Sequence, residues 1–138
     1  MSPIPVALFA YRRPRHLERT LDALARNRLV GEAKVTIWSD GPKKGNPQVQ
    51  EDVSAVRQVA AKWISDHPFA SLDLRSQESN RGLAASIIAG VGETLSDHGE
   101  VVVLEDDHVT AEGFLEYVRT GLDVYRDNPK VASIHAYT

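Results

Sequence analysis

Three consecutive carboxylates, Glu105, Asp106 and Asp107, follow the apolar residues 101–104. Like charges this close repel one another unless something positive lies near them. Alternate side chains of an extended chain share a face, so we expect Glu105 and Asp107 to point together and Asp106 to point away. Two converging carboxylates at a strand end suit a hard divalent cation, Mg²⁺ or Mn²⁺. The alternative interpretation is a solvated acidic turn before the next helix.

Arginines follow the first apolar run, residues 6–10, in the sequence Tyr11-Arg12-Arg13. A guanidinium group binds phosphate oxygens or the edge of a base well. Most surface arginines are simply solvated, so a basic helix start is the alternative.

Two further polar positions stand at the ends of apolar segments. Asp40 follows the β-branched and aromatic residues 35–38 and opens an Asp-Gly-Pro turn. Arg81 lies beside Asn80 at the start of a helical pattern, and a helix N-terminus with a nearby arginine attracts anions. Taken singly, Asp40 is better explained as a plain turn residue. Asn80 is equally well explained as the ordinary N-cap that we expect for the following helix.

Strand-like and helix-like patterns alternate along the chain. We expect strands at residues 6–10, 35–38, 72–75, 101–104 and 131–134. Thr110 should cap the last helix, and Asn128-Pro129 should stop it. The run 101–104 is the most apolar, so it should be central, whereas 72–75 alternates as an edge strand does. Helical faces are indicated by leucines 17, 21 and 24, by residues 49–64, by residues 83–95 and by residues 114–125.

This alternation implies an α/β fold in which a mainly parallel sheet is covered on both faces, a three-layer sandwich. Ligands of such sheets bind beyond the carboxyl ends of the strands. The acidic cluster, the two arginines after the first strand and Asp40 should therefore meet at one edge of the sheet.

Composition narrows the class of protein. The chain has 138 residues, which suits one domain over 1–138, and a formal net charge of −3, which argues against a general nucleic-acid binder. Cysteine is absent, so disulfides and thiolate chemistry are excluded. The sequence contains no phosphate-loop, GxGxxG, GxSxG or HExxH motif, and of the histidines only His108 adjoins the acidic cluster. With neither a signal peptide nor a membrane-length apolar run, we expect a cytoplasmic protein, with attachment to a membrane surface left open.

Taken together and in order, these motifs resemble the nucleotide-binding half of a GT-A glycosyltransferase. The resemblance rests on PVALFAYRRP at 5–14, WSDGP at 38–42, NRGLAAS at 80–86 and VLEDD at 103–107. The chain is similar to bacterial family-2-like sugar transferases and to the N-acetylglucosaminyltransferase I group, whose DXD motif has a Glu-Asp-Asp form. The resemblance implies strand order 3-2-1-4, with the last strand beside the fourth. One departure is Arg12, where related bacterial sequences lead us to expect asparagine.

The resemblance also implies roles for individual residues. Asp107 would bind Mn²⁺ or Mg²⁺ with support from Glu105, and Asp106 would reach the ribose or the sugar. Arg13 and Asp40 would contact the base, and Arg81 would lie near the donor. The full set of nucleotide-sugar-binding residues expected is Ala10, Tyr11, Arg13, Asp40, Arg81 and Asp106.

The implied activity is metal-dependent transfer of a sugar from a nucleotide-diphospho-sugar, with a UDP-sugar the first expectation. The acceptor would be a hydroxyl of a saccharide or lipid-linked molecule, as in cell-envelope polysaccharide synthesis. Such enzymes continue well past the DXD strand, so we expect an N-terminal part that is inactive alone, with the catalytic base beyond Thr138. Two alternatives stay open: a receiver-like regulatory module with an acidic Mg²⁺ pocket, and an assembly partner whose nucleotide site is degenerate.

Overall fold

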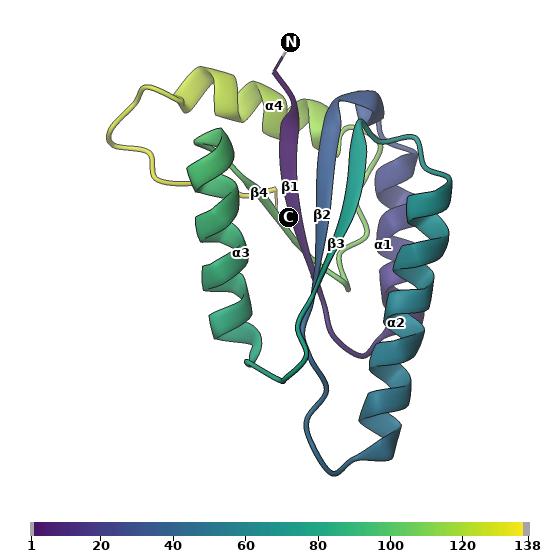
Figure 1. Ribbon diagram of the computed structural model, residues 1–138. Helices are drawn as coiled ribbons and strands as arrows, with labels where there is room; N and C mark the ends of the chain where they lie inside the picture. Colours follow the sequence, from purple (N-terminus) through teal and green to yellow (C-terminus); the bar gives the residue numbers. More distant parts are fainter. Residues whose placement is uncertain (1, 137–138) are drawn as a thin grey trace.

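A computed structural model describes residues 2–136 and contains one parallel sheet (Figure 1). Its strands are β1 (Ile4–Ala10), β2 (Ala33–Ser39), β3 (Ser71–Ser76) and β4 (Val102–Glu105). They lie in the order β3-β2-β1-β4, and all three neighbouring pairs are parallel. The expected order 3-2-1-4 is therefore confirmed.

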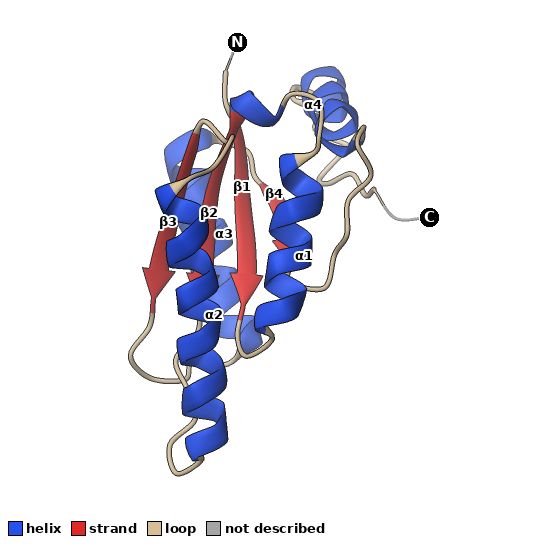
Figure 2. Cartoon of the chain, turned by 90° about the vertical axis from the view of Figure 1, so that its right-hand side faces the viewer, coloured by secondary structure: helices blue, strands red, loops and turns tan. Residues whose placement is uncertain are grey.

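Helices cover both faces of this sheet. They are α1 (Pro14–Ala25), α2 (Pro47–Ser65), α3 (Leu83–His98) and α4 (Phe114–Tyr125), with a short 3-10 turn, η1 (Val30–Glu32). Figure 2 shows α1 and α2 in front of the sheet and α3 behind it. The three-layer α/β sandwich predicted from the alternation is thus confirmed.

The main core lies between the sheet and the helices α1, α2 and α4. Leu17, Leu21 and Leu24 of α1 are completely buried there, which confirms the apolar stripe expected from their spacing. Burying a leucine side chain contributes about 1.5–3 kcal/mol, so this stripe is a main reason why α1 stays on the sheet. The other fully buried large side chains of this core are Ile4, Val6, Leu8, Val35, Ile37, Val56 and Leu115.

A smaller apolar cluster lies on the opposite face, under α3. It is formed by Ala7, Phe9 and Trp38, with Ile87 of α3 packed against them. Gly90 is where α3 comes closest to the sheet, because a Cβ atom there would be 2.7 Å from the Phe9 ring. Trp38 is a buried core residue, as its position in the strand pattern suggested.

Two expectations about the strands are wrong. Within residues 2–136, β4 pairs only with β1, so it is an edge strand, and Val103 is 42% exposed. β1 and β2 are the internal strands instead, and all seven residues of β1 are buried. Residues 131–134 form no strand: this segment returns along α4, where Ile134 lies against Gly121 and the Tyr117 hydroxyl donates to the His135 carbonyl. Tyr137 and Thr138 lie outside the described residues.

Both expected helix caps are also wrong. The residue before α3 is Gly82, with a φ of 85°, and the residue before α4 is Gly113. Asn27, just after α1, serves α4 instead, because its Oδ1 accepts from the Leu115 amide at 2.9 Å. The Thr110 hydroxyl accepts from Asn27 Nδ2 at 3.0 Å, so it supports that cap from outside the helix. α4 itself ends at Tyr125, before Asn128-Pro129.

No helix within residues 2–136 combines the length and the apolar character needed to cross a membrane.

Candidate functional site

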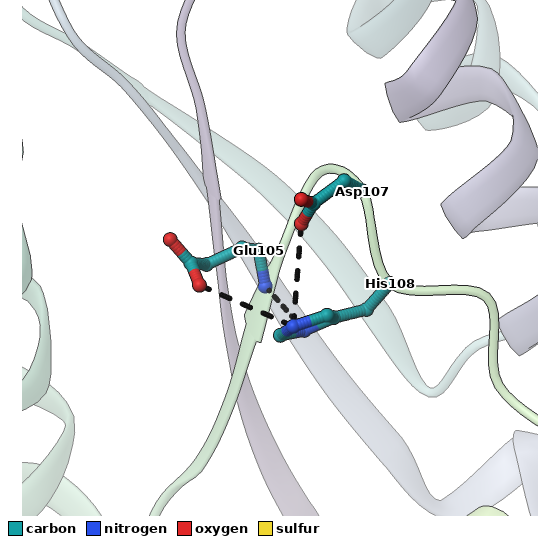
Figure 3. Close-up of side chains that lie close together, drawn as sticks. All are labelled: Glu105, Asp107 and His108. Carbon is teal, nitrogen blue, oxygen red and sulfur yellow. Dashed lines mark hydrogen bonds and ion pairs between the residues drawn. The ribbon is translucent and has the colours of Figure 1, made fainter. Parts of the chain in front are cut away.

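The acidic cluster forms a tight turn at the carboxyl end of β4. Glu105 pairs with Phe9 of β1, and the His108 amide donates back to the Glu105 carbonyl at 3.1 Å. Oxygen atoms of Glu105 and Asp107 and a ring nitrogen of His108 all lie within 4.8 Å of one another, and each side chain is half exposed (Figure 3). Asp106 is buried, with 4% of its surface exposed. The expected division of the three carboxylates between two faces is therefore confirmed.

Arg13 neutralises the buried carboxylate of this turn. Its guanidinium donates to Asp106 Oδ1 at 2.6 Å and lies 4.0 Å from Asp107 Oδ2. The Asp106 carbonyl in turn accepts from the Thr20 hydroxyl of α1 at 2.9 Å. Since a buried carboxylate is costly unless paired and hydrogen-bonded, these contacts explain how the chain tolerates Asp106 there.

Three polar residues spaced seven positions apart lie before, within and just after α1: Arg13, Thr20 and Asn27. Asp106 contacts the first two, and residues 110–115 contact the third. Side chains seven residues apart in a helix lie on the same face, two turns from each other. The sequence interpretation missed Thr20 and Asn27, although this spacing from Arg13 was a readable signal.

Asp40 forms a second group of contacts, at the carboxyl end of β2. Its Oδ1 accepts from the amides of Gly41 and Arg81 at 2.8 and 2.9 Å. Its Oδ2 accepts from the Gly82 amide at 3.0 Å and from Asn80 Nδ2 at 3.1 Å. A carboxylate has about four acceptor positions, so this buried side chain is fully used in holding the segment that leads into α3.

Arg57 of α2, on the face of the sheet opposite α3, also forms hydrogen bonds with this region. Its guanidinium donates to Ser39 Oγ at 3.1 Å, to the Gln77 carbonyl at 2.7 Å and to the Asp40 carbonyl at 3.4 Å. The ends of β2 and β3 are thereby tied to one side chain. Nothing local in the sequence marks Arg57 for this role, because its partners come from two other elements.

The remaining candidate residues lie around these two groups. Ala10 is the buried last residue of β1, and the Tyr11 hydroxyl is buried without a hydrogen-bond partner among residues 2–136. The Arg81 side chain is exposed, and only its amide contacts Asp40. Arg12, at the position where asparagine was expected, forms a hydrogen-bonded ion pair with Asp52 of α2 at 2.7 Å.

Asp52 is also bonded to Gln48 at 2.8 Å. The hydrogen bond from Gln48, followed by that from Arg12, lowers the pKa of the Asp52 carboxyl below its usual range. Both donors favour the charged carboxylate, so the contact between Arg12 and α2 is an ionic one at neutral pH.

The two groups of contacts share one edge of the sheet. Ala10 and Ser39 are register partners at the ends of β1 and β2, and the Asp40 amide donates to the Ala10 carbonyl at 3.3 Å. Among residues 2–136 no hydrogen bond or ion pair joins Asp40 to the acidic turn. Carboxylate oxygens are the donors that Mg²⁺ and Mn²⁺ prefer, so the two carboxylates of the turn, Glu105 and Asp107, fit either ion.

The strand order together with the covering of both faces gives the chain the fold of the N-terminal third of GT-A glycosyltransferases. The match to TarS 1-349 from S. aureus in complex with UDP has a TM-score of 0.65 at 16% identity, over 90% of this chain and 33% of that one. The match to the mannosyltransferase PcManGT from Pyrobaculum calidifontis, in complex with GDP-Man and Mn²⁺, has a TM-score of 0.62 at 22% identity. It covers 95% of this chain and 34% of that one.

The chain therefore spans about a third of the length of these solved structures. No protein-family model matches its sequence, and no curated protein matches it either. At these identities the likeness shows the fold alone.

Proposed function

We propose that the chain is the donor-binding part of a metal-dependent glycosyltransferase. The reaction would move a sugar from a nucleotide-diphospho-sugar to an acceptor hydroxyl. The observation that carries this proposal is the pair of carboxylates, Glu105 and Asp107, presented at the carboxyl edge of a GT-A sheet. Supporting it, S. aureus TarS has been solved with UDP-GlcNAc, and PcManGT with GDP-Man and Mn²⁺.

Asp107 and Glu105 are the residues proposed to hold Mn²⁺ or Mg²⁺. Both side chains are half exposed and their oxygens lie within reach of a common ion. The ion would neutralise negative charge that develops on the departing nucleoside diphosphate.

The nucleotide would lie along the edge between the ends of β1 and β2. We assign contacts with the base to Arg13 and Asp40, and contact with the ribose or sugar to Asp106. Because every acceptor position of Asp40 is used, a base N–H can bond to it only by replacing one of its four donors. Ala10, Tyr11 and Arg81 complete the proposed donor site around these residues.

Transfer also needs a general base that accepts the proton of the acceptor hydroxyl. We assign that role to no residue of this chain. A UDP-sugar donor and a saccharide or lipid-linked acceptor of the cell envelope are the proposed substrates, used at the cytoplasmic side of a membrane.

Thermal unfolding of the 138-residue chain with nucleotides tests the proposal. UDP or GDP should raise the midpoint in the presence of Mn²⁺ or Mg²⁺ and leave it unchanged with a chelator, since a ligand that binds only the folded state stabilises it. Asp107→Ala should abolish the shift. Asp97→Ala, an exposed carboxylate of α3, is the matched control and should retain it.

A shift that survives Asp107→Ala would remove Asp107 from the metal site. No shift with any nucleotide under any metal would contradict donor binding and favour a degenerate site in an assembly partner.

A further inference from the structure

His108 has a hydrogen bond at one ring nitrogen and lies near two carboxylates at the other. Its Nδ1 accepts a hydrogen bond from the Glu105 amide at 3.0 Å. Its Nε2 lies 4.0 Å from Glu105 Oε2 and 4.0 Å from Asp107 Oδ1. Figure 3 shows the ring turned back toward the acidic turn, with a dashed line to each of the two carboxylates.

The amide bond to Nδ1 assigns the tautomer. A backbone N–H can only donate, so Nδ1 must present a lone pair, and the ring proton of neutral His108 is on Nε2. Nε2 lies 4.0 Å from an oxygen of Glu105 and from an oxygen of Asp107, so its N–H gives the ring a positive edge near both carboxylates.

This assignment conflicts with His108 acting as a metal ligand. Ligation through Nε2 needs a lone pair there, which would move the proton to Nδ1 and set it against the Glu105 amide. Histidines that bind metals normally donate their second N–H to an acceptor, and here the partner of that nitrogen is itself a donor. The ring therefore has the wrong tautomer to join the carboxylates around an ion.

We infer that His108 is a positioning residue that holds Glu105 and Asp107 together and is displaced by the cation they bind. This inference rests on the proposed function, because it concerns the same metal site. The cation takes over the positive contact that Nε2–H makes with the two carboxylates, and the ring leaves the gap, losing its bond to the Glu105 amide.

Displacement and ligation predict opposite effects of removing His108 on the affinity for the cation. Without the ring, no hydrogen bond has to be broken when the cation binds, and the two carboxylates repel each other more strongly before it does. His108→Ala should therefore bind Mn²⁺ about three- to tenfold more tightly, the range that one hydrogen bond represents. Loss of a true ligand would weaken binding instead.

The experiment is an electron paramagnetic resonance titration of free Mn²⁺ with the 138-residue chain. His108→Ala is compared with the wild type and with His98→Ala, which removes an exposed histidine at the far end of α3. Tighter binding by His108→Ala alone supports the inference. Weaker or unchanged binding overturns it, while the proposed function stands as long as the wild type binds Mn²⁺ and Asp107→Ala does not.

A second measurement on the wild type reads the tautomer directly. In ¹⁵N spectra of the imidazoles above neutral pH, the His108 signal is assigned as the one that disappears in His108→Ala. This signal should show a protonated Nε2, both without and with saturating Mg²⁺. A proton that moves to Nδ1 when Mg²⁺ is added would identify His108 as a ligand and contradict displacement. If the wild type binds neither Mn²⁺ nor Mg²⁺, the proposed function itself fails.

Discussion

The side chains of Arg13 and Asp106 are 93 residues apart in the sequence and 2.6 Å apart in the fold. The first residue precedes α1 and the second follows β4, so this contact joins the loops beyond two neighbouring strands. It also brings a guanidinium to the acidic turn that the candidate metal site uses.

Arg13→Ala should lower the free energy of unfolding by about 1–3 kcal/mol, because it leaves the buried Asp106 carboxylate without its cation. The neighbouring Arg12→Ala is the matched control, because Asp52 is more exposed than Asp106 and keeps its hydrogen bond from Gln48, so the loss should be about 0–1 kcal/mol. Urea unfolding of both variants gives the comparison. Equal losses of unfolding free energy in the two variants would mean that the Arg13–Asp106 contact stabilises the fold no more than the Arg12–Asp52 contact does.

Asp40→Asn should be clearly destabilising although it preserves the shape of the side chain. The amide NH₂ would replace an oxygen that accepts two hydrogen bonds, so donors would face donors, at a cost of roughly 2–4 kcal/mol. Asp73→Asn, on an exposed position of β3, should change stability by no more than about 0.5 kcal/mol. An Asp40→Asn protein as stable as the wild type in urea would contradict the role of Asp40 as a structural acceptor.

Gly90→Ala and Gly92→Ala should act in opposite directions within α3. Alanine favours the helix by about 0.5–1 kcal/mol at either position. At Gly92 nothing lies within 4 Å of the new Cβ, so the variant should be more stable. At Gly90 the new Cβ would meet the Phe9 ring at 2.7 Å and Trp38 at 3.0 Å, so the loss of packing should outweigh the gain. Differential scanning calorimetry of the pair isolates the packing effect.

The carboxyl of Asp52 should titrate below the usual range for aspartate in a ¹³C-detected NMR titration. A depressed pKa in the folded state contributes stability above the unfolded value, and this stability is lost as the pH falls through the folded pKa. Gln48→Ala and Arg12→Ala should each raise this pKa, because each removes a hydrogen bond that favours the charged carboxylate. An unchanged Asp52 pKa in both variants would contradict these two contacts as its cause.

Local periodicity was enough to predict much of the fold. The leucines at 17, 21 and 24 fixed the buried face of α1, and simple alternation placed Glu105 and Asp107 on one side of the turn. The strand order came with the resemblance to GT-A enzymes, since alternation alone gives no order. These features depend on residues close in sequence or on a pattern that spans the whole chain.

The errors have a different origin. Residues 131–134 have the apolar and β-branched pattern of a strand, but they pack against α4, with Ile134 next to Gly121. Their own pattern does not indicate this partner. Thr110 has the right chemistry for a cap, yet Asn27 reaches the Leu115 amide from 88 residues away. Three of the four bonds to Asp40 and the three from Arg57 likewise join residues at least 17 positions apart, so no local signal could reveal them.

Arg13, Thr20 and Asn27 lie in α1 or next to its ends, and they contact the acidic turn and the segment that follows it. The position of α1 therefore determines the position of the acidic turn. A substitution that weakens the packing of the buried α1 leucines should therefore displace the carboxylates of the turn, although none of these leucines belongs to the turn. Genetic screens for loss of metal or nucleotide binding should therefore recover substitutions at buried α1 positions such as Leu21, remote from any ligand, alongside those in the turn itself.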